Sequence, residues 1–249
     1  MRLLRTVRGL SALARRSTQR ARAPRAANYP RMGRDTAGKL PVNPWPHAVA
    51  FVFAAIGLVY LIVRFRLSAS TVAVMCVYGS GLLVLFGASS VYHALASRRP
   101  AFTPVLRRID HASIYVMMAG SYTPVLYFGL DGIWRTATIA AVWTVSAAGV
   151  IVSIWLLHAP RALSTALYAA FGWAAVIPAV KLVERLPLPA TVLIAAGGVL
   201  YTIGAVVYAT KALNFWPGRF GFHEVFHCFV LAAAAVHFVA IAFFIAPPT

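Results

Sequence analysis

The stretch RFGFHEVFHCFVLAAAAVHF, residues 219–238, combines two opposing features. From Glu224 to Ala246 nearly every side chain is apolar, and about 20 such residues in a helix cross the hydrocarbon core of a membrane. Yet His223, Glu224 and His227 stand at the start of this run. Ionisable side chains within a membrane span are costly and usually face the interior of a helix bundle. The stretch therefore predicts a membrane helix that carries polar groups to a buried site.

The rest of the chain has the same apolar character. Of its 249 residues 61% are hydrophobic and 11% are charged, whereas soluble domains have about 25% charged residues. A soluble domain of this length would need more polar surface than this sequence supplies. The composition therefore favours a single membrane domain and excludes an ordinary soluble enzyme.

Apolar runs of helical length occur seven times, and the breaks between them are short and contain Pro, Gly or Arg. The pattern predicts an all-α, polytopic membrane protein with seven transmembrane helices, occupying residues 44–246. It leaves no room for a soluble domain. The expected spans are 47–63, 71–94, 110–129, 134–157, 164–181, 190–210 and 224–246.

A basic segment precedes the first span. Residues 1–39 contain ten arginines, one lysine and one aspartate, and so carry +10 of the formal charge of +18. Positive charge before the first span predicts an N-terminus inside the cell, and we expect this role rather than nucleic-acid binding. Residues 1–40 are expected to be a disordered tail. Their composition resembles an organellar transit peptide, and the alternative is a true translation start at Met32.

The ionisable groups within the spans are expected to converge at one membrane face. His93 ends the second run, Asp110 begins the third, and the group around His223 begins the seventh. Because successive helices alternate in direction, these ends meet on the same side of the membrane. With the N-terminus inside, that side is the cytoplasmic one.

The spacing of His223 and His227 suits a metal ion. Residues four apart lie on one helix face, about 6 Å from each other, as in the HExxH helices of zinc enzymes. A third ligand must come from another helix. His237 lies about 15 Å further along the same helix, whereas His93 is at the right depth. Three histidines with an open fourth position form a catalytic type of zinc site.

Two further residues are candidates for catalysis. Ser89 lies one helical turn before His93, and Asp110 can accept a proton from metal-bound water or orient that water. Glu224 is an alternative, although it points about 100° away from His223 on a helix. A purely structural role for the histidine pair, as a helix cap or a hydrogen-bonding partner, remains open.

The other histidines carry weaker signals. His111 faces a different direction from Asp110 and is expected at an interface. His237 is expected to be a hydrogen-bonded packing residue. His47 falls at the start of the first span, where a histidine is unremarkable. Haem ligation is not favoured, because an i, i+4 pair does not place two histidines on opposite sides of one iron.

Several segments resemble the hemolysin III proteins, the bacterial branch of the progestin and adipoQ receptor family. The likeness covers residues 44–246 and combines SxxxH, an aspartate seventeen residues after that histidine, and HxxxH in the last helix. It departs from the family before the first helix, where the usual Glu and Asn signature is reduced to VNPWPHAVAF (42–51). The segments are SSVYH (89–93), LRRIDHASIYVMMAGSYTP (106–124), LYTIGAVVYA (200–209) and GFHEVFHCFVLAAAAVHF (221–238).

The resemblance implies a seven-helix protein of the cell membrane, in a bacterium the inner or plasma membrane, with its N-terminus inside. It implies zinc held by His93, His223 and His227 on the cytoplasmic side. Ser89 and Asp110 would flank the metal and its water.

Three functions are compatible with these features. The first is a zinc-dependent hydrolase of amide- or ester-linked acyl lipids, with a membrane lipid as substrate. The second is a non-enzymatic sensor or receptor with structural zinc and a lipid ligand, favoured if four ligands close the metal shell. The third is a cytolysin, for which the sequence has no long amphipathic stretch. The identity of the lipid and the oligomeric state are left open.

Overall fold

Helices make up the part of the chain that the computed structural model describes, which is residues 45–96, 98–155, 161–216 and 220–246. The predicted tail at 1–40 lies outside these residues. Two 3₁₀ turns, Pro100–Phe102 and Ala174–Val176, and a π-helical turn, Ile241–Ile245, join or extend the helices. The α-helices are α2 (Trp45–Arg64), α3 (Ala69–Leu95), α4 (Thr103–Gly129), α5 (Gly132–Trp155), α6 (Arg161–Trp173), α7 (Ala179–Arg185), α8 (Leu188–Thr210) and α9 (Phe222–Ala240).

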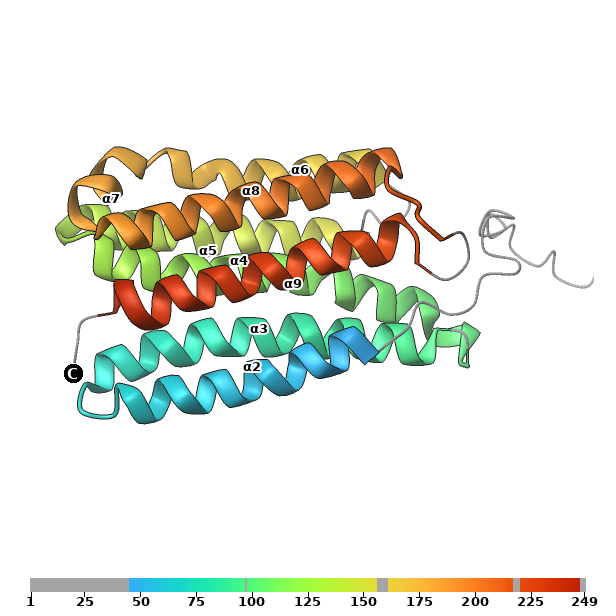
Figure 1. The fold of residues 1–249 in the computed structure, drawn as a ribbon, viewed down its shortest axis with the longest axis horizontal. Coiled ribbons are helices and arrows are strands. Elements are labelled where there is room, and N and C mark those ends of the chain that lie inside the picture. Colours follow the sequence, from blue (N-terminus) through green and yellow to red (C-terminus); the bar gives the residue numbers. More distant parts are fainter. Residues whose placement is uncertain (1–44, 97, 156–160, 217–219, 247–249) are drawn as a thin grey trace, which may run out of the picture. The chain divides into compact units, whose positions relative to one another are not determined.

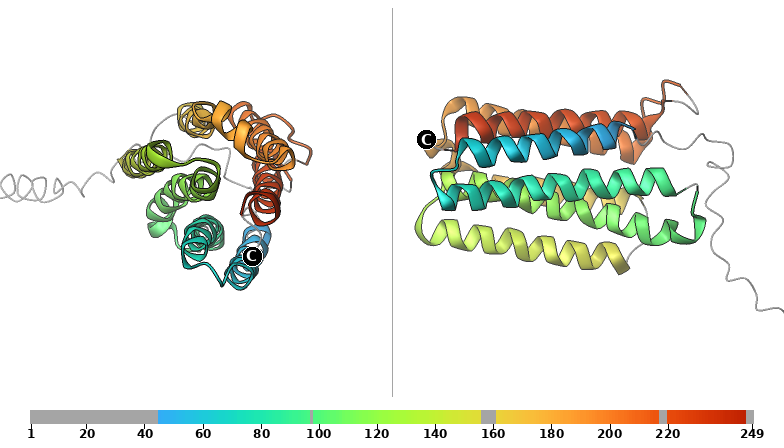
Figure 2. Two further views of the ribbon diagram at one scale, coloured as in Figure 1. Left: turned by 90° about the vertical axis from the view of Figure 1, so that its left-hand side faces the viewer. Right: turned by 90° about the horizontal axis from the view of Figure 1, so that it is seen from below.

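The long helices lie side by side and enclose a common interior (Figure 1). Seen end-on, α2, α3, α4, α6, α8 and α9 follow one another around this interior, and α9 returns to α2 (Figure 2). Aromatic side chains fill the contact between α9 and α2, where the ring centroids of Tyr60 and Phe238 are 6.5 Å apart. The helix α5 lies outside the ring, against α4. Helices distant in sequence therefore share one interior.

The outer surface of this bundle is apolar. Phe53, Ile56 and Trp155 are 68%, 59% and 81% exposed, which suits contact with lipid because a bilayer core offers no hydrogen bonds to polar groups. Among the described residues, five helices are long and apolar enough to cross a membrane, and a bent pair raises this to six, compared with the seven spans that the sequence predicts. The predicted all-α, polytopic membrane fold is confirmed.

The helix α4 was predicted as a span but is more polar than the other long helices. Its first turns contain Arg107, Arg108 and Asp110, and its apolar part is interrupted by Pro124. It nevertheless runs beside α3 along the bundle and carries many buried residues. From Ala112 onward many of its side chains are buried against other helices, and this burial explains why its composition differs from that of α5.

The fifth predicted span, 164–181, is broken rather than continuous, which corrects the sequence-based prediction. The helical segments on either side of the break meet at 51°. Pro178 has no N–H and cannot continue the hydrogen-bond ladder. The Tyr122 hydroxyl of α4 lies at the break, donating to the carbonyl oxygens of Phe171 and Gly172 at 3.0 and 2.6 Å and accepting from the Ala175 N–H at 3.1 Å. The exposed backbone groups at the break are therefore satisfied by a neighbouring helix.

Hydrogen bonds and close packing hold α5 against α4. The Ser146 hydroxyl donates to the Tyr115 carbonyl at 3.0 Å, and the Trp143 indole N–H donates to Thr123 Oγ1 at 3.2 Å. Gly149 lies against the Tyr115 ring so closely that a Cβ atom there would overlap it. A small residue is therefore required at this contact.

We predict that Gly149→Ala destabilises the protein. The added methyl group must displace a buried tyrosine, and overpacking of this kind costs about 1–3 kcal/mol. The matched control is Gly198→Ala on α8. There no atom of the described residues lies within 4 Å of the new Cβ, and replacing glycine by alanine stabilises the helix by about 0.5–1 kcal/mol. Thermal unfolding in detergent would measure both, and equal midpoints for the two variants would contradict the packing argument.

Candidate metal centre

Four histidines from three helices meet at one end of the bundle. His93 lies in the last turn of α3, and His223 and His227 lie in the first two turns of α9. His47 lies in the first turn of α2. These helix ends share one end of the bundle (Figure 1), as the alternation of helix directions predicts.

The three histidines singled out from the sequence lie together. The Nε2 atoms of His223 and His227 are 2.8 Å apart. The ring centroid of His93 is 5.4 Å from that of each of the other two. The i, i+4 pair therefore brings its two imidazoles together, and His93 approaches them from a neighbouring helix.

His47 is the member that the sequence interpretation missed. Its ring centroid is 5.0 Å from that of His93 and 4.1 Å from that of His227. One potential ligand atom from each of these three residues lies within 4.8 Å of the others. The only sequence signal was its place at the start of the first predicted span. That position puts His47 at the same end of the bundle as the start of the last span, where His223 and His227 lie. His47, His93 and His227 could together hold a metal ion.

Two buried nitrogens in this cluster have no hydrogen-bond partner among the described residues. They are His47 Nδ1 and His93 Nε2, and both residues are less than 10% exposed. Leaving a buried polar atom unsatisfied costs about 1–3 kcal/mol, and such atoms are rare in folded proteins. Coordination of an ion would satisfy both nitrogens at once.

The distances fit a small ion such as Zn²⁺. Zinc binds imidazole nitrogen at about 2.0–2.1 Å in tetrahedral geometry, which places neighbouring ligand nitrogens about 3.4 Å apart. The 2.8 Å between His223 and His227 lies below this value, and the 4.8 Å limit for the set with His47 lies above it. The spacings of the donor atoms therefore bracket the value for a zinc site.

A hydroxyl–carboxylate pair adjoins the histidines. The Ser89 hydroxyl donates to Asp110 Oδ1 at 2.5 Å, joining α3 to α4. Ser89 is buried and lies one helical turn before His93, so the two side chains occupy the same helix face. The carboxylate is therefore held in a defined position near the histidine cluster.

The remaining polar candidates have other contacts. Glu224 accepts a hydrogen bond from the Gly221 N–H at 2.8 Å, which caps the start of α9 and engages its carboxylate away from the histidine pair. The His111 ring makes an edge contact with Tyr168 of α6. His237 donates through Nε2 to the Ile194 carbonyl at 3.1 Å, as expected for a hydrogen-bonded packing residue.

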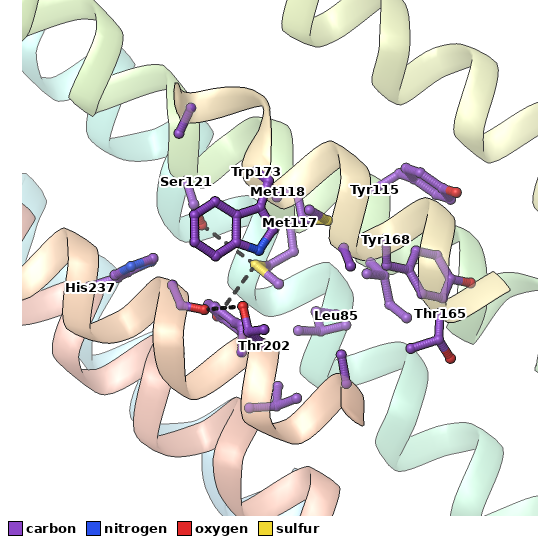
Figure 3. Close-up of a pocket in the computed structure, with 18 of the residues that line it drawn as sticks. Leu85, Tyr115, Met117, Met118, Ser121, Thr165, Tyr168, Trp173, Thr202 and His237 are labelled. Atoms are coloured by element: carbon purple, nitrogen blue, oxygen red, sulfur yellow. Dashed lines mark hydrogen bonds between the residues drawn. The ribbon is translucent and has the colours of Figure 1, made fainter. Parts of the chain in front are cut away.

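A cavity of about 510 Å³ extends from the histidines into the bundle. His47, His223 and His227 line it together with Ser89 and Asp110. Its walls are mostly apolar, with a few polar groups further in. Figure 3 shows this deeper part, where Ser121 and Tyr201 donate to the sulfur of Met117 at 3.5 and 3.9 Å. Residues from α3 to α9 contribute, among them Leu85, Met118, Tyr168, Trp173, Thr202 and His237.

Comparison with known proteins gives consistent matches. The sequence profile described as haemolysin-III related matches residues 38–238. Hemolysin-3 of Bacillus cereus is 29% identical over 207 residues, covering 82% of this chain and 91% of that protein. The Adiponectin receptor protein of Drosophila melanogaster is 28% identical over 221 residues, covering 79% of this chain and about half (48%) of that protein.

We predict that His93→Ala and His227→Ala each weaken metal binding at least tenfold. Loss of a neighbour that merely orients a ligand typically weakens metal affinity 10–100-fold, and loss of a ligand itself should cost at least as much. The control is His111→Ala, whose ring contacts α6 instead. Metal content of the purified proteins, measured by mass spectrometry, decides: metal retained at wild-type level in both test variants would contradict the site.

Proposed function

Because this chain belongs to the haemolysin-III-related family and is a multi-pass protein of the cell membrane, we propose that it is a zinc-dependent hydrolase of acyl lipids. The proposed site lies near the cytoplasmic face, and its substrate is an amide- or ester-linked lipid. The observation that carries the proposal is the Ser89–Asp110 pair, held beside the histidines at one end of an apolar cavity.

The proposed ligands are His93, His223 and His227. Imidazole nitrogen is a good ligand for zinc, and His223 and His227 chelate from a single helix. A bound zinc ion would act as a Lewis acid, polarising a carbonyl group and making water nucleophilic near neutral pH. The unpartnered nitrogen of His93 supports its place in the set.

Asp110 is proposed as the proton acceptor. A positioned carboxylate that takes a proton from attacking water can later return it to the leaving amine or alcohol. The hydrogen bond from Ser89 orients the carboxylate and leaves Oδ2 for this role. Ser89 is therefore a positioning residue, and Glu224, which caps α9, has no part in the reaction.

The cavity supports a lipid substrate. Its volume of about 510 Å³ is within the usual range of small-ligand sites, and its mostly apolar walls suit an acyl chain. The polar groups that it contains near the histidines suit the headgroup linkage. A substrate lying in this way presents its carbonyl group to the proposed metal and its chain to the bundle interior.

A non-enzymatic sensor with structural zinc is the second candidate. The convergence of His47 with His93 and His227 favours it, because a fourth imidazole would close the metal shell. A purely structural ion, however, gives no reason for a serine–aspartate pair on the wall of a large cavity. We do not extend to this chain the cytolysis that the name of the Bacillus relative suggests.

We predict that Asp110→Asn keeps bound zinc and lowers hydrolysis about 10²–10⁴-fold, the usual contribution of a general base. The amide has nearly the same shape but cannot accept the proton. Zinc content and hydrolysis of a panel of fluorescent acyl amides and esters would be measured on the purified protein.

Asp131→Asn is the matched control for the charge change. Asp131 lies between α4 and α5 and pairs with Arg185 at 2.5 Å, and the hydrogen bond from Arg185 lowers the pKa of its carboxyl. It is exposed and outside the cavity, so we expect wild-type hydrolysis. Full activity of Asp110→Asn would exclude Asp110 as the base. Zinc-loaded wild type that hydrolyses no member of the panel, but is stabilised by zinc, would support the sensor instead.

A further inference from the structure

The position of His47 suggests more than a packing role. Its side chain is 3% exposed, and its ring meets that of His227 edge-on at 4.1 Å. Its Nδ1 atom has no hydrogen-bond partner within the described ranges. A buried histidine in a lipid-facing bundle normally has such a partner, as His237 does with the Ile194 carbonyl. The described residues with which His47 could share a metal ion are His93 and His227.

Four imidazoles are enough to complete a tetrahedral shell. His47, His93 and His227 each place one ligand atom within 4.8 Å of the others, and His223 adjoins this set through its Nε2 atom, 2.8 Å from that of His227. A complete shell of this kind is typical of structural zinc, whereas catalytic zinc keeps one position for water or substrate. The neighbouring Ser89–Asp110 pair and the cavity are features of the catalytic type. Both sets of features are reconciled if one of the four ligands can leave.

His47 is the ligand best placed to leave. It lines the cavity together with His223 and His227, so a group arriving through the cavity meets its ring. His223 and His227 support each other from one helix, and His93 adjoins Ser89 on α3. Of the two histidines that stand alone on their helices, His47 is among the residues that line the cavity and His93 is not. Withdrawal of His47 would leave the other three imidazoles in place.

We propose that His47 is an exchangeable fourth metal ligand that closes the site at rest and is displaced by an oxygen donor of an acyl lipid. This inference rests on the proposed zinc site. It assigns to α2 a gating role: the ion is shielded until a ligand in the cavity provides a carbonyl or carboxylate oxygen. The lipid must then compete with an imidazole that is already bound to the metal. Its apparent affinity is its intrinsic affinity multiplied by the fraction of molecules in which His47 has left the metal.

X-ray absorption of the zinc-loaded, full-length protein tests the coordination directly. We expect four imidazoles around zinc in the wild type, and three imidazoles with one oxygen in His47→Ala. Added imidazole should restore the fourth nitrogen in that variant. His111→Ala, which removes a histidine elsewhere on the cavity wall, should keep four. Three imidazoles and one oxygen in both wild type and His47→Ala would overturn the proposal.

Exchange is tested with a long-chain fatty hydroxamate, which joins a zinc-binding oxygen pair to an acyl chain. Its binding should remove one imidazole from the wild-type zinc shell. It should also bind His47→Ala about tenfold more tightly, the factor expected if about one wild-type molecule in ten is open. Equal affinities, or a wild-type shell that keeps all four imidazoles with the probe bound, would overturn the exchange.

Two further variants separate the possible failures. If His47→Ala does not fold, His47→Gln keeps a polar side chain of similar size, and the same coordination change is expected because its amide is a poor zinc ligand. If His93→Ala and His227→Ala retain zinc, the metal site itself is wrong. If they lose zinc while His47→Ala leaves the wild-type shell unchanged, the metal site holds and the role of His47 fails.

Discussion

Burial of ionisable groups within an apolar bundle is the constraint on which the rest of this structure depends. A bilayer core satisfies no polar atom, so each such group must find its partner inside the protein. Most of them gather at one end of the helices, where Ser89 bonds to Asp110 and His223 meets His227. The remaining bundle can then expose apolar side chains to lipid.

At this end of the bundle, the buried polar groups form an imidazole cluster that adjoins a cavity. The imidazole cluster could hold a cation, and the adjacent cavity has space for a molecule beside it. The serine–aspartate pair links them, because it belongs to the histidine-bearing helix α3 at one end and to the cavity-lining helix α4 at the other. The related proteins bear the names of a hemolysin and of a receptor, which illustrates that a shared fold does not by itself specify an activity.

Two features of the structure differ from the sequence-based prediction or add to it, and each has a physical cause. The apolar composition of 164–181 is equally compatible with a straight and a broken span, and beside the break at Pro178 the backbone groups are satisfied by Tyr122 from another helix. Glu224 belongs to an HExxH pattern, but its carboxylate is used by the nearby backbone of Gly221. Both outcomes are decided by partners that a pattern along one helix does not include.

The amino-acid sequence alone was sufficient to predict that His93, His223 and His227 share one end of the bundle, because helical rise and the alternation of spans convert residue number into position along the bundle. It also determined that His223 and His227 share a face, since this follows from the helical repeat. Only the tertiary structure decided that His47 joins them. The first and last helices are neighbours because the ring closes, and ring closure depends on how every intervening helix packs on the next.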